Sequence, residues 1–200
     1  MMNRRMLAGA ALLAAITASF AFAQQTVRVR GTIEKVDGNA LSVKADDGTV
    51  VTLMLTSDAA VVGVVKATLA DVKEGSFVGS AAMPQPDGSQ KALEVHIFPE
   101  TMRGTGEGHR PFTVPNSTMT NGTVGDMVTA SDGQSLTVKY KGGEKKIVVP
   151  PGVPIVRYEI ADRSALKPGA RVTATSAVKK PDGTLEAARI NVGRDGLVPQ

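Results

Sequence analysis

The chain has 200 residues, with 23 Lys and Arg against 19 Asp and Glu, and it contains neither Cys nor Trp. Its hydrophobic content of 42% and charged content of 21% are typical of a globular protein rather than a disordered one. Because there is no cysteine, disulfides, thiolate zinc sites and thiol redox chemistry are excluded. At about 100–200 residues per domain, this length fits one ordinary domain or two small ones.

Residues 1–23 have the three regions of a secretory signal peptide. Arg4 and Arg5 form a positive start, residues 6–22 form an uncharged apolar run, and Ala21-Phe22-Ala23 provides the small residues of a cleavage site. The alternative is an uncleaved N-terminal anchor. Cleavage is the better interpretation, since polar residues follow the apolar run at once.

Cleavage would leave residues 24–200, and the loss of two arginines would lower the formal net charge from +4 to +2. We therefore expect a periplasmic protein of nearly neutral charge that keeps no integral membrane span. A permease is excluded, because it needs several spans of about 20 apolar residues each.

The remaining chain repeats itself at offsets that settle at 94 or 95 residues. The first copy runs from about Val27 to Phe98 and the second from about Gly122 to Val192, so each has about 70 residues. Two copies are too few for a solenoid, which needs at least three units, and a tandem pair of small domains is the prediction. The matched segments are Gly31-Thr32-Ile33 with Gly122-Thr123-Val124, Leu41–Lys44 with Leu136–Lys139, Val72–Gly75 with Leu166–Gly169, and Pro86–Gly88 with Pro181–Gly183.

Each copy has the alternating apolar pattern of half-buried strands, separated by Asp-Gly and Gly-Gly turns. Five strands are predicted in each copy. In the first copy they are Thr26–Val36, Ala40–Ala45, Val50–Leu55, Ser76–Met83 and Lys91–Phe98. In the second they are Thr123–Ala130, Ser135–Tyr140, Lys145–Val149, Ala170–Lys179 and Leu185–Val192.

A short helical turn is predicted between the third and fourth strands of each copy, at residues 68–73 and 162–167. Five strands with a helical piece at that place form the strand plan of an OB-fold barrel. The predicted fold is thus all-β, with two tandem five-stranded OB-like barrels. The expected boundaries are a signal peptide at 1–23, a first barrel at 24–98, a Gly/Pro-rich linker at 99–120, a second barrel at 121–193 and a tail at 194–200.

Each copy resembles the OB-like domain of unknown function that occurs, often in tandem, in exported bacterial proteins. The resemblance rests on the opening Gly-Thr-Ile/Val segments, on a late strand after a Pro-Asp-Gly turn, and on the segments Leu69–Val78 and Leu166–Val172. Arg163 departs from this pattern, because it stands at the first Leu position in the second copy. The resemblance implies a fold and an exported location, and no settled activity.

Nucleic-acid binding and catalysis are both disfavoured. An OB fold binds single strands with a basic groove and stacking aromatic rings, but the mature chain has only three Phe and two Tyr. The chain has no Gly-x-Ser-x-Gly or His-Glu-x-x-His motif, and most of its Ser and Asp residues fall in turns. We expect a protein that is not an enzyme and does not bind nucleic acid.

The segment between the copies gathers polar residues of both signs on a Gly-rich loop. Arg103, Glu107, His109 and Arg110 are therefore the candidate patch for an envelope protein or a small, anionic ligand. The alternating glycines resemble a phosphate cradle, but no helix pattern follows them, so an extended linker is the simpler interpretation.

A second hypothesis is a periplasmic copper or zinc protein. His96, Met102 and His109 lie on or beside this segment, and His and Met are ligands that an exported copper protein would use. Their spacing matches no known metal motif. The sequence thus predicts an exported, non-enzymatic binding or structural module without a cofactor, with copper or zinc binding as the alternative.

Overall fold

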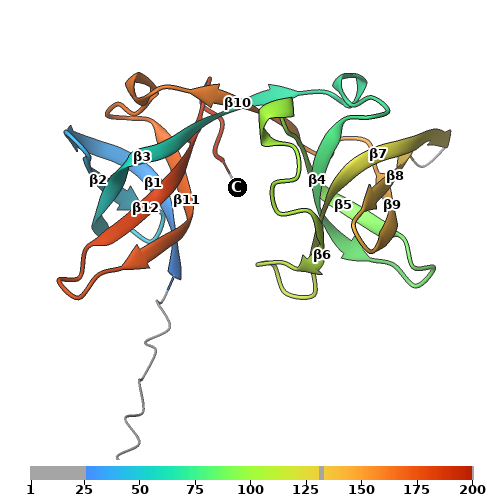
Figure 1. Cartoon of the computed structure of the whole chain (residues 1–200), viewed down its shortest axis with the longest axis horizontal. Coiled ribbons are helices and arrows are strands. Elements are labelled where there is room, and N and C mark those ends of the chain that lie inside the picture. The colour runs from blue at the N-terminus through green and yellow to red at the C-terminus, as the bar shows by residue number, and fades with distance from the viewer. Residues whose placement is uncertain (1–25, 131–132, 200) are drawn as a thin grey trace, which may run out of the picture.

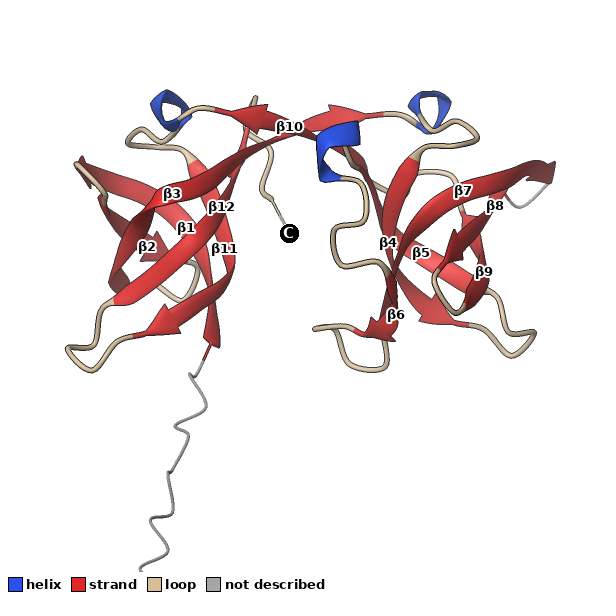
Figure 2. Ribbon diagram, in the orientation of Figure 1, coloured by secondary structure: helices blue, strands red, loops and turns tan. Residues whose placement is uncertain are grey.

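The computed structural model describes residues 26–130 and 133–199 and is all-β (Figures 1 and 2). The predicted signal peptide, residues 1–23, lies outside this range. None of the helical turns within the range has the length or apolar content of a membrane-spanning helix. The strands are β1 Thr26–Asp37, β2 Ala40–Ala45, β3 Val50–Ala67, β4 Phe77–Pro84, β5 Gln90–Ile97, β6 Gly108–Pro111, β7 Thr118–Ala130, β8 Gly133–Tyr140, β9 Gly143–Val149, β10 Ile155–Ala161, β11 Arg171–Lys179 and β12 Leu185–Gly193, with 3-10 turns η1 Leu69–Asp71, η2 Glu100–Met102 and η3 Arg163–Ala165.

Five strands close into a barrel, here called the first barrel. They follow the order β12-β11-β1-β2-β3, and β12 pairs back onto β3 to complete the circle. Alternate residues of these strands point inward, as expected for half-buried strands. The resulting core includes Ile33, Leu41, Val43, Leu53 and Ile190, each no more than 1% exposed.

Five further strands, here called the second ring, follow the order β5-β4-β7-β8-β9. A short parallel contact between β5 and β9, at Gln90 with Ile147 and Lys91 with Val148, links the two ends of this series. Its core includes Val78, Val95, Val138 and Ile147, none of which is exposed. The two groups of strands form two lobes joined across the top (Figure 1).

Each lobe takes strands from both sequence copies, and this corrects the predicted domain boundaries. Residues 24–98 were expected to form one barrel and residues 121–193 another. Instead, β1 pairs with β11 of the second copy, with Gly31 opposite Val172, and β7 pairs with β4 of the first copy, with Gly122 opposite Val78. The two copies have therefore exchanged their last two strands.

The exchange depends on β3, which continues to Ala67 although the sequence predicts its end at Leu55. Residues 49–62 contain neither Gly nor Pro, so nothing in the chain favours a turn there. At the matching place in the second copy, Pro150-Pro151-Gly152 separates β9 from β10, a strand that was not predicted. Residues Val61–Ala67 pair antiparallel with Ile155–Ala161, and these two strand segments, here called the arch, span the lobes (Figure 2).

Side chains alternate between the two faces of the arch. On β10, Arg157 is exposed, whereas Val156 and Tyr158 are buried at 4% and 7% exposure. The buried face belongs to a third apolar cluster that joins the lobes. Its members are Val62, Val64, Phe77, Phe98, Val156 and Tyr158, with Met102 and Leu197 packed against it.

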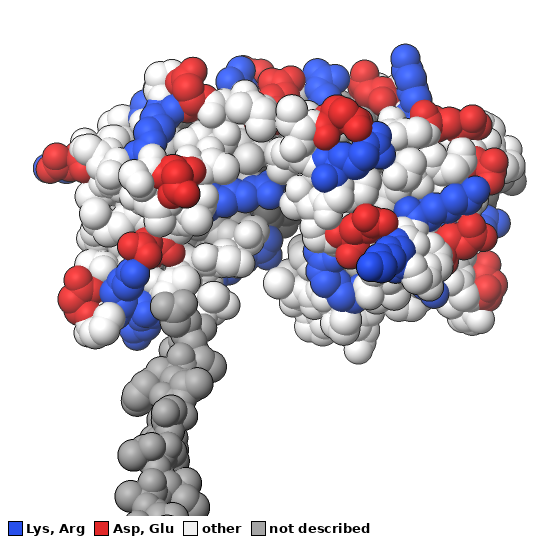
Figure 3. Space-filling model, viewed as in Figure 1, with Lys and Arg blue, Asp and Glu red and all other residues white. Residues whose placement is uncertain are grey.

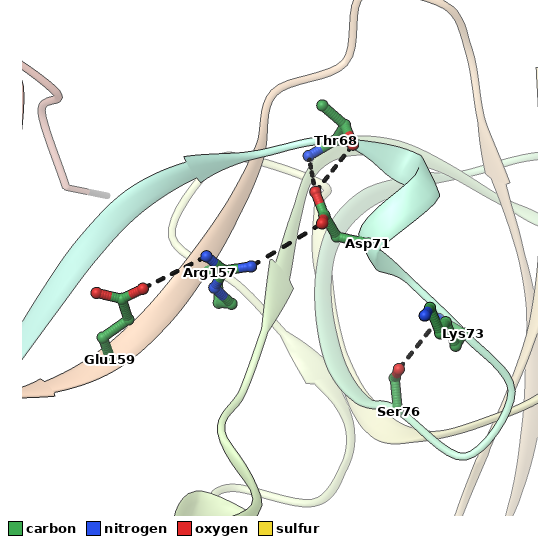
Figure 4. A network of polar contacts seen from close by, with 6 residues as sticks. All are labelled: Thr68, Asp71, Lys73, Ser76, Arg157 and Glu159. Carbon is green, nitrogen blue, oxygen red and sulfur yellow. Dashed lines mark hydrogen bonds and ion pairs between the residues drawn. The ribbon is translucent and has the colours of Figure 1, made fainter.

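A polar network fastens the outer face of the arch to η1 (Figure 4). The backbone N–H and the hydroxyl of Thr68 both donate to Asp71 Oδ2 at 2.8 Å. These hydrogen bonds lower the pKa of the Asp71 carboxyl. Arg157 of β10 lies 3.9 Å from Asp71 and 3.4 Å from Glu159, so it connects η1 with the crossing strand.

Arg163, which stands where the first copy has Leu69, has a structural role in the exchanged arrangement. From η3 of the second copy its guanidinium donates to the Thr56 carbonyl at 2.6 Å and to the Ser57 carbonyl at 3.1 Å, and it also bonds Asn39. All three partners belong to the first copy. An arginine here satisfies carbonyls in the polar stretch of β3, which leucine could not do.

The predicted linker, residues 99–120, contains more regular structure than expected. It holds η2, the short strand β6 and the start of β7, and β6 pairs with β7 with His109 opposite Thr120. The segment is therefore packed along the second ring as an added edge strand (Figure 1).

The closest strand approaches depend on glycine and give the first prediction. A Cβ on Gly31 would lie 2.2 Å from the Lys44 carbonyl oxygen, and a Cβ on Gly122 would lie 2.3 Å from that of Lys139. Because backbone must move, Gly31→Ala is expected to lower the free energy of unfolding by about 1–3 kcal/mol in urea titrations. At Gly63 the nearest atom is the flexible Arg194 side chain at 3.3 Å, so Gly63→Ala should cost much less. Equal effects at both positions would contradict the close approach.

Candidate ligand site

A cavity of about 150 Å³ lies beneath the arch, where the first barrel, the second ring and the linker meet. We call it the cleft. Figure 3 shows the notch between the two lobes, with Lys and Arg atoms on its walls. The cleft is lined by Arg28, His96, Phe98, Thr105, Gly106, Arg110, Phe112, Met119, Asn121, Tyr158, Thr175, Arg189 and Asn191.

Two arginines of the first barrel are stacked on aromatic rings of the cleft. Arg28 of β1 lies over the Phe112 ring at 6.0 Å and donates to Thr113 Oγ1 at 3.3 Å. Arg189 of β12 lies over the Tyr158 ring at 5.8 Å. The cation–π attraction holds each guanidinium over its ring, and the N–H groups that make no other contact can still donate to a carboxylate or another planar anion.

The cleft carries positive charge that no carboxylate pairs with directly. Among the ion pairs of residues 26–130 and 133–199, none includes Arg28, Arg110 or Arg189. Arg110 of β6 instead donates to the Gly106 carbonyl at 2.6 Å. Partial burial lowers the pKa of Arg28 and of Arg189, because it removes water from the charged guanidinium. A small anion entering the cleft would restore the lost stabilisation.

A buried polar chain lies beside these arginines. Glu94 Oε1 approaches His96 Nε2 to 3.1 Å, and His96 Nδ1 lies 3.0 Å from the Tyr158 hydroxyl. Burial raises the pKa of Tyr158, so this hydroxyl stays protonated and forms a hydrogen bond with Nδ1. The Tyr158 ring also packs edge-on against Phe98, with centroids 5.1 Å apart. The contact with Tyr158 thereby orients the His96 ring, and Glu94 lies beside its Nε2.

Of the four residues in the predicted linker patch, only Arg110 lines the cleft. Arg103 instead fastens the linker to the second ring. It donates to Glu100 Oε2 at 2.7 Å and to the Gly75 carbonyl at 2.9 Å, and it lies 5.8 Å from the Phe77 ring centroid. These contacts explain why the linker is packed rather than extended.

Glu107 and His109 also hold the linker in place. Glu107 accepts a hydrogen bond of 2.9 Å from the backbone N–H of Lys141. His109 Nδ1 lies 2.8 Å from Thr120 Oγ1, and its ring stacks on Tyr140 with centroids 6.4 Å apart. Burial lowers the pKa of His109, which favours the neutral form of the ring.

The three candidate metal ligands have different surroundings. His96 lies between Glu94 and Tyr158, Met102 packs on the apolar cluster below the arch, and His109 lies against Tyr140. In the described part of the chain, no three His, Asp or Glu side chains form a group that could hold a metal. The copper or zinc alternative remains a prediction from sequence.

A larger depression, of about 620 Å³, lies between η3 and the C-terminal tail. Its walls mix Lys167, Arg171 and Arg194 with Asp162 and Asp195. Arg171 is already paired, since its Nη2 lies 2.6 Å from an oxygen of Asp46. Because both signs of charge are present, this surface favours no particular class of ligand.

Sequence reasoning missed most of the cleft. Arg28 and Arg189 lie on outward positions of predicted strands, where an arginine is normally solvated. Tyr158 lies on β10, which was not predicted. These residues meet because the copies exchange strands, and no local motif signals that meeting. Comparison of the chain with protein-family models, curated proteins and solved structures gave no match.

The buried hydroxyl of Tyr158 gives the second prediction. Tyr158→Phe keeps the ring packing but leaves the buried His96 Nδ1 without its hydrogen-bond partner, so the free energy of unfolding should fall by about 1–3 kcal/mol. Tyr140→Phe is the matched control, because no hydrogen bond to the Tyr140 hydroxyl exists among the described residues. Urea unfolding of the two variants measures the difference. A larger loss for Tyr140→Phe would contradict the hydrogen bond to His96.

Proposed function

We propose that this is an exported, non-enzymatic binding protein that holds a small anion in the cleft. The observation that carries the proposal is that three arginines, Arg28, Arg110 and Arg189, line one cavity and that none of them has an ion pair with a carboxylate among the described residues. Arginine is the side chain best suited to bind carboxylates and phosphates, through its planar fork of N–H donors.

The walls of the cleft suit such a ligand. Phe98, Phe112 and Met119 provide an apolar surface, and the side chains of Asn191 and Thr175 add neutral polar groups. A predominantly apolar pocket with a few convergent polar groups is the usual composition of a small-molecule site. Rigid strands carry all three arginines, which reduces the entropy lost on binding.

The same proposal includes the fold type and location. The closed strand order and the 3-10 turns between β3 and β4 and between β10 and β11 support two OB-like barrels with exchanged strands. The N-terminal sequence supports export to the periplasm. An envelope protein could equally use the outer surfaces, but no described feature of those surfaces favours it.

Thermal unfolding in the presence of small anions tests this function. The full mature protein is titrated with sodium acetate, benzoate, succinate or phosphate, with chloride keeping the ionic strength constant. At one hundred times its dissociation constant, a bound anion should stabilise the fold by about 2.7 kcal/mol, with a saturable rise in melting temperature. Arg189→Gln should abolish most of that rise.

Lys35→Gln is the charge-matched control, because the Lys35 side chain is 74% exposed and its ion pair in the described part of the chain is with Asp37, at the edge of the first barrel. It should respond to the anions as the wild-type protein does. The proposal fails if no anion raises the melting temperature, or if Arg189→Gln responds as strongly as Lys35→Gln.

A further inference from the structure

The charge in the cleft exceeds what one carboxylate would neutralise. Arg28, Arg110 and Arg189 line the cavity, and Glu94, which lies beside His96, is the one carboxylate that influences the ionisation of Arg28 within the described ranges. One negative charge against three positive charges leaves two uncompensated. Charge complementarity therefore favours a ligand with two negative charges over a monoanion.

The positive groups contact different parts of the cleft wall. Arg189 lies over the Tyr158 ring of β10 and donates to Asn191 Oδ1. Arg28 lies over the Phe112 ring and donates to Thr113 Oγ1, so it reaches the same segment that carries Arg110. A ligand that contacts both parts would carry its charges apart along its length.

Apolar atoms lie among these positive groups. Phe98, at 8% exposure, and Met119, at 5%, contribute to the same cavity. A chain of CH₂ groups would bury its surface against them, whereas a phosphate ion would leave them without an apolar partner. The volume of about 150 Å³ is well below that of a drug-sized site, so the chain must be short.

We propose that the ligand is a short linear dicarboxylate, held with one carboxylate at Arg189 and the other at Arg28 and Arg110. This inference rests on the proposed anion-binding function and specifies its substrate class. It assigns the linker a binding role through Arg110, and the ligand would bridge the linker and the first barrel.

Isothermal titration calorimetry of the full mature protein with four probes tests the assignment: succinate, acetate, benzoate and phosphate, at one pH and ionic strength. Succinate should bind tighter than acetate by about tenfold or more, because it makes an additional charge-assisted contact. Arg110→Gln should remove most of that difference while changing acetate affinity little. Lys35→Gln should preserve the full difference.

The other outcomes distinguish a failure of this inference from a failure of the proposed anion-binding function. If acetate or benzoate binds as tightly as succinate and Arg189→Gln abolishes that binding, the assignment of a dicarboxylate is wrong and the proposal of anion binding is supported. If phosphate binds tightest, the apolar spacer is wrong and the ligand is a compact anion. If none of the four probes binds, both proposals fall.

Discussion

The antiparallel pairing of β3 with β10 is the interaction on which the rest of the structure depends. Seven residue pairs, from Ile155 with Ala67 to Ala161 with Val61, carry each copy of the repeat across to the opposite lobe. The pairing satisfies backbone groups that would otherwise need a turn or water, and it places Val156 and Tyr158 over a shared apolar cluster. Without this crossing, each copy would have to supply its own last two strands.

The cleft is a consequence of that crossing. Arg28 belongs to the first copy and Arg189 to the second, yet both lie in the first barrel and line the cleft. Tyr158, on the crossing strand itself, contacts both Arg189 and His96. If each copy closed its own barrel, these groups would not meet through the crossing strands. The candidate site therefore depends on the strand exchange.

Local sequence patterns predicted the strands well, because alternation and Asp-Gly turns act over a few residues. All ten predicted strands overlap strands of the structure, although β6 and β10 were missed. The pairing of strands could not be predicted, because the repeat gives the first strand of each copy two equivalent possible partners. Val78 and Val172 hold matching places in the two copies, and each pairs with a glycine that also has a counterpart in the other copy. Arg110 was identified because it lies on a Gly-rich loop that is visible in the sequence. Arg28, Tyr158 and Arg189 were not identified, because they meet only through the pairing of distant strands.

Disulfide trapping tests the strand exchange most directly, because the natural chain has no cysteine. Thr26 pairs with Val178 across β1 and β11, and Met83 holds the matching place in β4. Paired residues of antiparallel strands lie about 4.5–5.5 Å apart at Cα, within disulfide range. Thr26→Cys with Val178→Cys should form an intramolecular disulfide in the oxidised monomer, detected by peptide mapping, while Thr26→Cys with Met83→Cys should stay reduced. A disulfide in the second variant and none in the first would contradict the exchange.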